Sequence, residues 1–451
     1  MKCRNHKYSI VNPSIYVVLA GDDMLKIPGE YINAYRSIPG YIIVGSRKHA
    51  AIKPCHWLEQ KLFTGRRGCY KEKFYGVKSH LCIQNTPVLY FCTHRCLFCW
   101  RVQPSDLGLS WKESSLEGFE LDDAIHLAEE MIAAQKRMIQ ERYSIDRLLT
   151  NYENMIKILE VLLKERRAIT GVQIAEKAEI SRRKFREAAE HLLREGLIAE
   201  AGGGRYILSK DVEEVAESTD DLEDLVKRRV ANPADIRRVH REALEPKHAA
   251  ISLAGEPLLY PQIGELVEEF RRRGFTTFIV SNGTLPEALE NISREPSQLY
   301  ITLPAPNEKI YLEVCRPLIE RGWRRLMRTL ELLDTLSCRT VIRITAVKNL
   351  NMVKPEEYAK IIENANPHFV EVKGFTYVGG ARRRMGDYCE RMGYPRERAF
   401  ELFQPRHSDI VEFSRKICEY GGFEIINEFV PSAVTLIDVN WGKRSTKLVP
   451  A

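Results

Sequence analysis

From about residue 86 onward, short apolar runs alternate with longer amphipathic segments. The apolar runs are rich in β-branched and aromatic residues and predict buried strands at 87–91, 249–253, 276–280, 299–303, 341–347 and 369–375. Between them, apolar residues recur at helical spacing, as in 263–273, 323–335 and 355–364. This alternation favours an α/β fold with a parallel sheet of βα units. Six such units predict an incomplete (β/α)6 barrel with its active site at the carboxyl ends of the strands.

The interval between the first two predicted strands is too long for one crossover helix and has its own pattern. Amphipathic helices are predicted at 154–165, 171–177 and 181–195, the last opened by Ser181 as N-cap. The sequence GLIAEAGGGRYIL then predicts two short strands joined by a glycine-rich turn, at 197–199 and 206–208. Three helices followed by a hairpin are typical of a winged helix-turn-helix. An acidic linker, 213–224, leads back to the sheet.

These patterns predict four segments. They are an N-terminal extension (1–86), the first part of the barrel (87–142), an inserted winged-helix domain (143–226), and the rest of the barrel with a C-terminal tail (227–451). The hydrophobic fraction of 44% and charged fraction of 29% fit a soluble globular protein. The chain has no apolar run of about 18–20 residues and opens MKCRNHKYSI without signal-peptide features, so we expect a cytoplasmic protein.

Cysteine usage suggests metal chemistry. In a reducing compartment, clustered cysteines are better explained as metal ligands than as disulfides. Six of the eleven fall early in the chain: Cys55, Cys69, Cys82, Cys92, Cys96 and Cys99. The other five are scattered and are interpreted as small buried or neutral residues: Cys3, Cys315, Cys338, Cys389 and Cys418.

The motif CTHRCLFC, which holds Cys92, Cys96 and Cys99, directly follows an apolar run. A tight loop can wrap three thiolates around one corner of a 4Fe–4S cubane, which leaves the fourth iron open to chelate S-adenosylmethionine (SAM). The alternatives are a zinc site or three unrelated thiols. Structural zinc commonly takes four ligands in paired spacing, and no fourth ligand is obvious nearby in the sequence.

Polar residues lie at or near the ends of three further predicted strands. Gly255-Glu256-Pro257 offers a close backbone approach and a carboxylate for the SAM ammonium, although such a tripeptide is commonly just a turn. Ser281 and Asn282 of SNGT offer polar groups for ribose or carboxylate, or a helix N-cap. Thr302 is a weaker SAM candidate.

The upstream cysteines Cys55, Cys69 and Cys82 are too widely spaced to form a self-contained metal motif, so the residues alone leave a second cluster open. Lys71 and Lys73 follow Cys69. A lysine in an apolar pocket or beside positive charge can lose its proton and form a Schiff base with a ketone. The ordinary alternative is a solvated surface lysine.

The stretches CYKEKFYG, CIQNTPVLYFCTHRCLFCWR, AISLAGEPLLYP, SNGT, QLYITLPAPNE and FVEVKGF resemble the 4-demethylwyosine synthase family of radical SAM enzymes over about 30–139 and 228–437. The resemblance implies a lyase of wybutosine biosynthesis that condenses N1-methylguanosine at position 37 of phenylalanine tRNA with pyruvate. It implies a SAM cluster on Cys92, Cys96 and Cys99, a second 4Fe–4S cluster on Cys55, Cys69 and Cys82, and Lys71 as the pyruvate-binding lysine. There is no flavodoxin-like domain, so we expect the shorter archaeal type, a monomer that uses an external ferredoxin or flavodoxin.

The 143–226 insert is not associated with that family. The formal net charge of +7 permits a polyanionic partner without demonstrating one. Residues 164–186 hold eight Lys or Arg against three Glu, so Arg182, Arg183 and Lys184 are candidate tRNA phosphate contacts. Protein contact or a passive insert are the alternatives. Residues 382–384 form a further candidate, Arg382-Arg383-Arg384, which could equally be a solvated basic loop.

Two other functions stay open from the sequence. One is a different radical SAM enzyme, either an activating enzyme or another tRNA-modifying enzyme. The other is a winged-helix regulator with an iron–sulfur sensor, which leaves GEP, SNGT and the βα units without a purpose.

Overall fold

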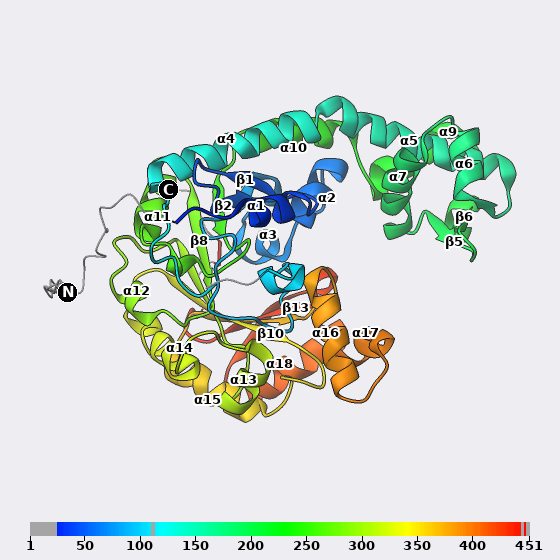
Figure 1. The fold of residues 1–451 in the computed structure, drawn as a ribbon. Coiled ribbons are helices and arrows are strands. Elements are labelled where there is room, and N and C mark those ends of the chain that lie inside the picture. The colour runs from blue at the N-terminus through cyan, green and yellow to red at the C-terminus, as the bar shows by residue number, and fades with distance from the viewer. Residues whose placement is uncertain (1–24, 110–112, 443–445, 448–451) are drawn as a thin grey trace, which may run out of the picture.

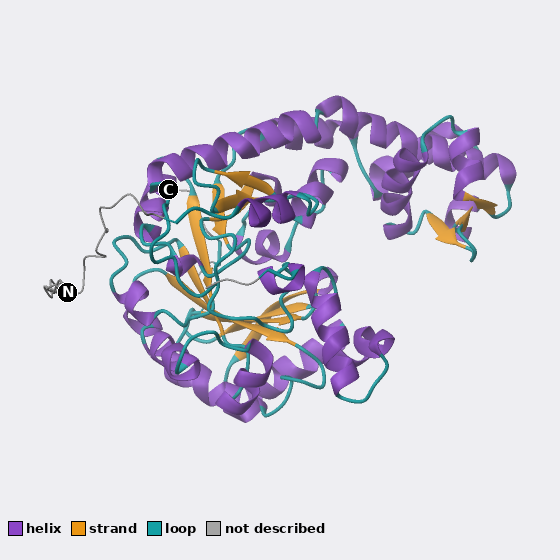
Figure 2. Cartoon of the chain, in the orientation of Figure 1, coloured by secondary structure: helices purple, strands orange, loops and turns teal. Residues whose placement is uncertain are grey.

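A ten-stranded mixed sheet organises the main body of the protein in the computed structural model, which describes residues 25–109, 113–442 and 446–447 (Figures 1 and 2). Cys3 lies outside these ranges. The strands, in spatial order, are β1 (Ile42–Val44), β2 (Ala50–Ile52), β3 (Cys82–Thr86), β7 (His248–Ile251), β8 (Thr276–Ser281), β9 (Gln298–Thr302), β10 (Arg339–Ala346), β11 (Phe369–Gly374), β13 (Val434–Asp438) and β12 (Glu424–Phe429). Strands β3, β7, β8, β9, β10 and β11 pair in parallel, and both margins of this sheet are antiparallel. The predicted α/β fold is confirmed.

The first predicted strand is wrong in position. The strand that enters the sheet is β3, whereas residues 87–91 form turns before the CTHRCLFC loop. Val88 and Phe91 are nevertheless fully buried, because this segment packs beneath the loop without entering the ladder. The apolar pattern of residues 87–91 therefore predicts their burial correctly, but these residues do not pair with a strand. The other five parallel strands lie within two residues of their predicted bounds.

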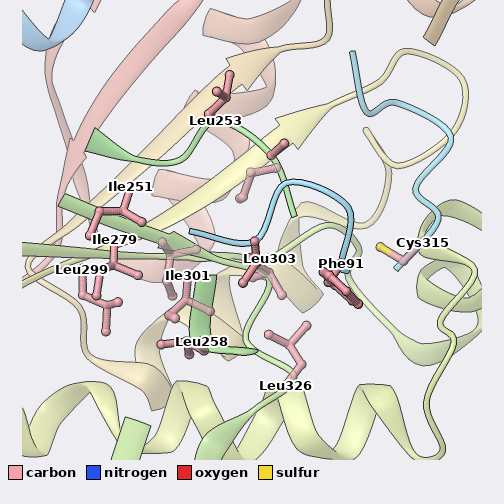
Figure 3. Packing of buried hydrophobic residues seen from close by; sticks show 14 of the residues in the cluster. Phe91, Ile251, Leu253, Leu258, Ile279, Leu299, Ile301, Leu303, Cys315 and Leu326 are labelled. Carbon is pink, nitrogen blue, oxygen red and sulfur yellow. The ribbon is translucent and has the colours of Figure 1, made fainter. Parts of the chain in front are cut away.

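Helices cover the outer face of the sheet. Ile279, Leu299 and Ile301 from neighbouring strands and Leu326 belong to one core cluster, and all four side chains are fully buried (Figure 3). Burying each such side chain contributes roughly 1.5–3 kcal/mol. The helices of the main body are α1 (Gly29–Arg36), α2 (His56–Thr64), α3 (Tyr70–Tyr75), α4 (Ala124–Arg142), α10 (Pro233–Ala243), α11 (Ile263–Arg272), α12 (Pro286–Glu290), α13 (Glu308–Cys315), α14 (Gly322–Glu331), α15 (Pro355–Ala365), α16 (Gly380–Arg391), α17 (Ala399–Phe403) and α18 (His407–Gly421).

The opposite, inner face of the parallel strands is covered by α3. Tyr70, Phe74 and Tyr75 of this helix belong to one buried cluster with Phe278 and Tyr300 of β8 and β9. Side chains alternate along each strand, so the residues two positions on, Val280 and Thr302, also lie on the inner face. The helix that follows Cys69 is thereby placed against the inner face of the sheet.

The segment between α4 and α10 stands away from the sheet (Figure 1). It contains α5 (Ile145–Glu165), α6 (Gly171–Lys177), α7 (Arg182–Arg194), α8 (Lys210–Glu213), α9 (Thr219–Arg229) and a sheet of order β4 (Ile169–Thr170), β6 (Arg205–Leu208), β5 (Ile198–Glu200). The N-cap prediction at Ser181 is confirmed, because its hydroxyl accepts from the Lys184 N–H at 3.3 Å. The predicted acidic linker is wrong in part: α9 begins there, with a capping box between Ser218 and Asp221.

Within the described ranges, no helix is both long enough and apolar enough to cross a bilayer.

Candidate functional site

One cavity of about 130 Å³ brings together most of the predicted SAM-cluster residues. They lie in the loops that follow β3, β7 and β8, and at the end of β9, because parallel strands present their carboxyl ends at one edge. The predicted residues that line the cavity are Cys92, Cys96, Cys99, Gly255, Glu256, Ser281, Asn282 and Thr302. Pro257 is buried beside it, where it begins a 3-10 helix, Pro257–Leu259.

The cysteine loop is held by backbone contacts on two sides. The Cys92 N–H donates to the Glu113 carbonyl at 2.9 Å, and the Leu97 N–H donates to the Val314 carbonyl at 2.9 Å at the end of α13. The His94 ring nitrogen Nε2 lies 2.7 Å from the Tyr311 hydroxyl on the same helix. These contacts set the loop backbone before any ligand binds.

Cys92 and Cys96 in this cavity would ionise more readily beside a cationic partner. Burial is the main cause that raises the pKa of Cys92. The pKa of Cys96 is raised first by a hydrogen bond to Cys315 and second by burial. A thiolate there needs positive charge nearby, which an iron cluster supplies. Cys315, interpreted from the sequence as a small buried residue without a functional role, lines the same cavity. Its Sγ, the Cys96 Sγ and a His94 ring nitrogen lie within 4.8 Å of one another.

Gly255 is required by close packing. Its φ is +70°, and a Cβ built there would lie 2.0 Å from the Val88 carbonyl oxygen and 2.4 Å from that of Phe91. The next residue, Glu256, donates its N–H to the same Phe91 carbonyl at 2.8 Å. The loop after β7 can therefore reach the cysteine loop only with glycine at this position.

The Glu256 carboxylate is buried, with 1% of the residue exposed. It accepts from the Asn282 N–H at 2.7 Å and from the Leu258 N–H at 3.1 Å. Burial outweighs these hydrogen bonds and raises the pKa of Glu256 to about 7. A bound ammonium would relieve that cost by favouring the ionised carboxylate.

Polar side chains of the SNGT turn connect β8 to the cysteine loop. The Asn282 side-chain amide donates to Thr93 Oγ1 at 2.8 Å and lies 3.8 Å from Cys92 Sγ. The Ser281 hydroxyl accepts from the Gly283 N–H at 2.9 Å. Thr302, the last residue of β9, is partly buried. This turn both supports the loop and presents polar atoms to the cavity.

The three upstream cysteines lie near enough to one another to interact electrostatically. Cys55 caps α2, where its sulfur accepts from the Leu58 N–H at 3.3 Å; Cys69 directly precedes α3; and Cys82 begins β3. Burial raises the pKa of all three thiols, and the pKa of Cys55 rises to about 12. The pKa of Cys55 is raised further by Cys69, and the pKa of Cys82 is raised further by Cys55 and Cys69. Three partly buried thiols from separate elements that interact electrostatically are a set that could hold a second cluster.

Of the two lysines after Cys69, only Lys71 faces the inner side of the sheet. Its Nζ lies 4.7 Å from the Tyr300 ring centroid and 4.9 Å from that of Phe278. Burial, followed by the Arg343 guanidinium, lowers the pKa of Lys71. Lys73 is exposed and donates to the Glu428 carbonyl at 2.6 Å.

The basic candidates differ in their surroundings. Arg182, Arg183 and Lys184 are exposed at the start of α7, and Arg382 and Arg383 are exposed at the start of α16. Arg384 departs from the expected basic loop because only 7% of it is exposed. Its guanidinium forms an ion pair with the Asp106 carboxylate and donates to the Cys99 carbonyl, so it supports the cysteine loop from below.

Comparisons with known proteins agree with this geometry. A Radical SAM superfamily model matches residues 209–380. An S-adenosyl-L-methionine-dependent tRNA 4-demethylwyosine synthase of Pyrococcus abyssi is 36% identical over 95% of this chain and 93% of its own length. The enzyme of that name from Methanocaldococcus jannaschii is 28% identical over 89% of this chain and 94% of its own.

A solved structure described as TYW1 with a lysine-pyruvate adduct bound matches 94% of this chain and all of its own, with a TM-score of 0.59 and 26% identity. Because the Pyrococcus abyssi relative covers nearly all of the chain at 36% identity, the protein belongs to the family of S-adenosyl-L-methionine-dependent tRNA 4-demethylwyosine synthases.

Proposed function

We propose that this protein forms 4-demethylwyosine by condensing N1-methylguanosine at position 37 of phenylalanine tRNA with pyruvate. The observation that carries the proposal is the pairing of two features on one sheet. The cysteine loop and the GEP, SNGT and Thr302 positions share a cavity, and Lys71 lies on the inner face of the same strands. The relatives share the activity in their names, and a neighbour carries a lysine-pyruvate adduct.

The fold proposed for this activity is an incomplete (β/α)6 barrel made by β3 and β7 to β11, with α3 against its inner side. Cys92, Cys96 and Cys99 would hold the SAM cluster, and Cys55, Cys69 and Cys82 would hold a second 4Fe–4S cluster. When bound and reduced, the SAM cluster would supply one electron for the cleavage of SAM into methionine and a 5′-deoxyadenosyl radical. Glu256 would accept from the SAM ammonium, and Ser281, Asn282 and Thr302 would orient its other polar groups.

Lys71 would bind pyruvate covalently. Its neutral amine attacks the C2 carbonyl, the carbonyl oxygen leaves as water, and an imine forms. Burial and the Arg343 guanidinium favour the neutral amine. The rings of Tyr300 and Phe278 lie against the Lys71 amine and would keep solvent away from the bound keto acid. The guanine base must be splayed out of the anticodon loop to reach this site.

The test is product formation by the whole reconstituted enzyme. Anaerobically prepared protein is incubated with SAM, a reductant, pyruvate and tRNA containing N1-methylguanosine. We expect the tricyclic nucleoside to appear with pyruvate carbon incorporated. SAM cleavage without incorporation of that carbon would instead support a different radical SAM reaction.

Glu256 predicts a pH dependence of SAM binding. Its pKa is raised to about 7, so the carboxyl is largely neutral below that pH and cannot attract an ammonium. We expect SAM affinity to increase about tenfold from pH 6 to pH 8. The Glu256→Gln variant should bind SAM more weakly at pH 8 and show little pH dependence.

Equilibrium dialysis with unreduced holoenzyme measures both constants. Glu113→Gln is the matched control, because the Glu113 carboxylate lines the same cavity but already forms an ion pair with Arg95 at 2.9 Å. It should keep the pH dependence. A wild-type affinity for SAM that does not change with pH would contradict the proposed role of Glu256 in SAM binding.

We further propose that residues 143–226 form a winged-helix insert between two parts of the barrel, 87–142 and 227–451, after an extension at 1–86. The order α5, β4, α6, α7, β5, β6 supports a winged-helix topology. The first turn of α7 carries Arg182, Arg183 and Lys184, although the helix dipole disfavours cations there. That cost supports a phosphate-binding role for these exposed side chains, with Arg382 and Arg383 as second contacts.

Replacing Arg182, Arg183 and Lys184 together by alanine should weaken tRNA binding and reduce its salt dependence. A plot of log affinity against log salt has a negative slope, and the magnitude of that slope should decrease by about 2–3, since each phosphate contact contributes about 0.7–0.9. Filter binding over a salt series measures it. Lys360→Ala with Arg415→Ala, two exposed cations on α15 and α18, is the control, and an unchanged slope in the triple variant would leave the insert without a tRNA role.

Reconstituted protein is proposed to act as a cytoplasmic monomer that receives electrons from a ferredoxin or flavodoxin. The proposal follows from the resemblance to the shorter archaeal enzymes.

A further inference from the structure

The apolar side of α2, the helix that Cys55 caps, packs into the core of the insert. This helix lies between the main sheet and α7 (Figure 1). Three of its residues belong to one buried cluster with residues of α4, α5, α7 and α10: Leu58, Leu62 and Phe63. Cys55 packs against the same cluster. The position of this thiol therefore depends on the insert as well as on the sheet.

The carboxyl end of α7 contacts the segment that joins Cys55 to Cys69. The Arg194 guanidinium donates to the side-chain oxygen of Gln60, a buried residue of α2. The Glu195 carboxylate forms an ion pair with Arg67, two residues before Cys69. Both side chains of this pair are mostly buried, so salt screens it less than an ion pair on the surface. One end of α7 thus holds both cysteine-bearing segments.

Contacts within the segment transmit this support. The Thr64 hydroxyl donates to the Gln60 carbonyl at 2.7 Å and accepts from the Arg67 N–H at 3.2 Å. Lys61 of α2 forms an ion pair with Glu72 of α3 at 2.8 Å. These bonds link α2, the turn after it and α3 into one unit, and α7 contacts that unit at both Gln60 and Arg67.

We propose that α7 positions the second set of thiols, with Arg194 and Glu195 as positioning residues. The inference rests on the proposed function, because it needs a second cluster. Cys82 is fixed by the pairing of β3 with β7, whereas Cys55 and Cys69 precede short helices outside the sheet. A cluster needs its thiolates at a fixed spacing, so these two helices require support from another element.

Alkylation of the cluster-free full chain tests this support separately from cluster assembly. A thiol reagent is added, and mass spectrometry follows each cysteine over time. In the α7 double variant, Arg194→Met with Glu195→Gln, we expect Cys55 and Cys69 to react about 10- to 100-fold faster. That change corresponds to local opening after the loss of a charged hydrogen bond. Cys82 should react at the wild-type rate, because the sheet holds it.

A charge reversal separates this ion pair from a general effect on stability. Arg67→Glu alone should resemble the α7 double variant, and Arg67→Glu combined with Glu195→Arg should recover most of the slow reaction. Lys157→Met with Glu200→Gln replaces two exposed charges of the insert and is the matched control, which should behave as wild type.

Iron release to a chelator is the second measurement. A full chain with alanine at Cys92, Cys96 and Cys99 should retain about four irons, all on the second cluster. Adding the α7 double variant to that chain should speed their release about tenfold or more. With the SAM-cluster cysteines intact, SAM cleavage by the α7 double variant should stay within about twofold of wild type, because α7 does not line the SAM cavity.

Unchanged alkylation of Cys55 and Cys69, or unchanged iron release, in the α7 double variant would overturn the positioning role. Equal acceleration at Cys82 and at Cys338, which is buried beside β10, would also overturn it, because the variant would then have lost stability throughout. A wild-type holoenzyme with only about four irons would instead refute the proposed second cluster, and the role of α7 with it.

Discussion

Replacing Lys71 by methionine is expected to lower formation of the tricyclic nucleoside by at least about 1000-fold, because the proposed imine with pyruvate forms on the Lys71 amine. Methionine keeps the length and apolar stem that pack against Tyr300 and Phe278, so the inner face of the sheet should stay closed. SAM cleavage should persist, since Lys71 does not line the SAM cavity. Chromatography of digested tRNA measures the product, and release of 5′-deoxyadenosine measures SAM cleavage.

The matched control is Lys73→Met on the same helix. Lys73 is exposed and bonded to the Glu428 carbonyl, so its loss should leave the product rate within about twofold of wild type. Equal losses in both variants would indicate damage to α3, and product formation by Lys71→Met at the wild-type rate would place pyruvate activation elsewhere.

Replacing Cys92, Cys96 and Cys99 together by alanine should abolish SAM cleavage altogether. The three thiols are the proposed protein ligands of the SAM cluster, and they line one cavity. The raised pKa values of Cys92 and Cys96 mean that a cationic partner would favour their thiolate forms. Wild-type protein should hold about eight irons per chain and the variant about four. Alanine at Cys55, Cys69 and Cys82 should also leave about four, but with SAM cleavage retained.

Iron assay and electron paramagnetic resonance of the reduced protein measure these contents. Cys418→Ala is the control, because Cys418 is a partly buried cysteine on α18, away from both groups. About four irons in wild-type protein, unchanged by replacement of the upstream cysteines, would contradict the second cluster.

Local features were predictable where one segment carries its own signal. The helix at 171–177 has its predicted bounds, and the Ser181 cap follows from hydrogen bonding within a single turn. The segment at 213–224 was misjudged because its acidic composition hid the Ser218 capping box. The strand at 87–91 was misplaced because burial beneath the cysteine loop has the same apolar pattern as a buried strand.

The sequence by itself determined the α/β class, the cysteine motif and the polar positions that follow the strands, because each depends on residues close together in the chain. Only the tertiary structure decided which lysine enters the inner face, that Cys315 lies against Cys96, and that Arg384 is buried. These depend on strand order, register and the packing of α3 on the sheet, which join residues far apart in the chain and leave no mark in any one segment.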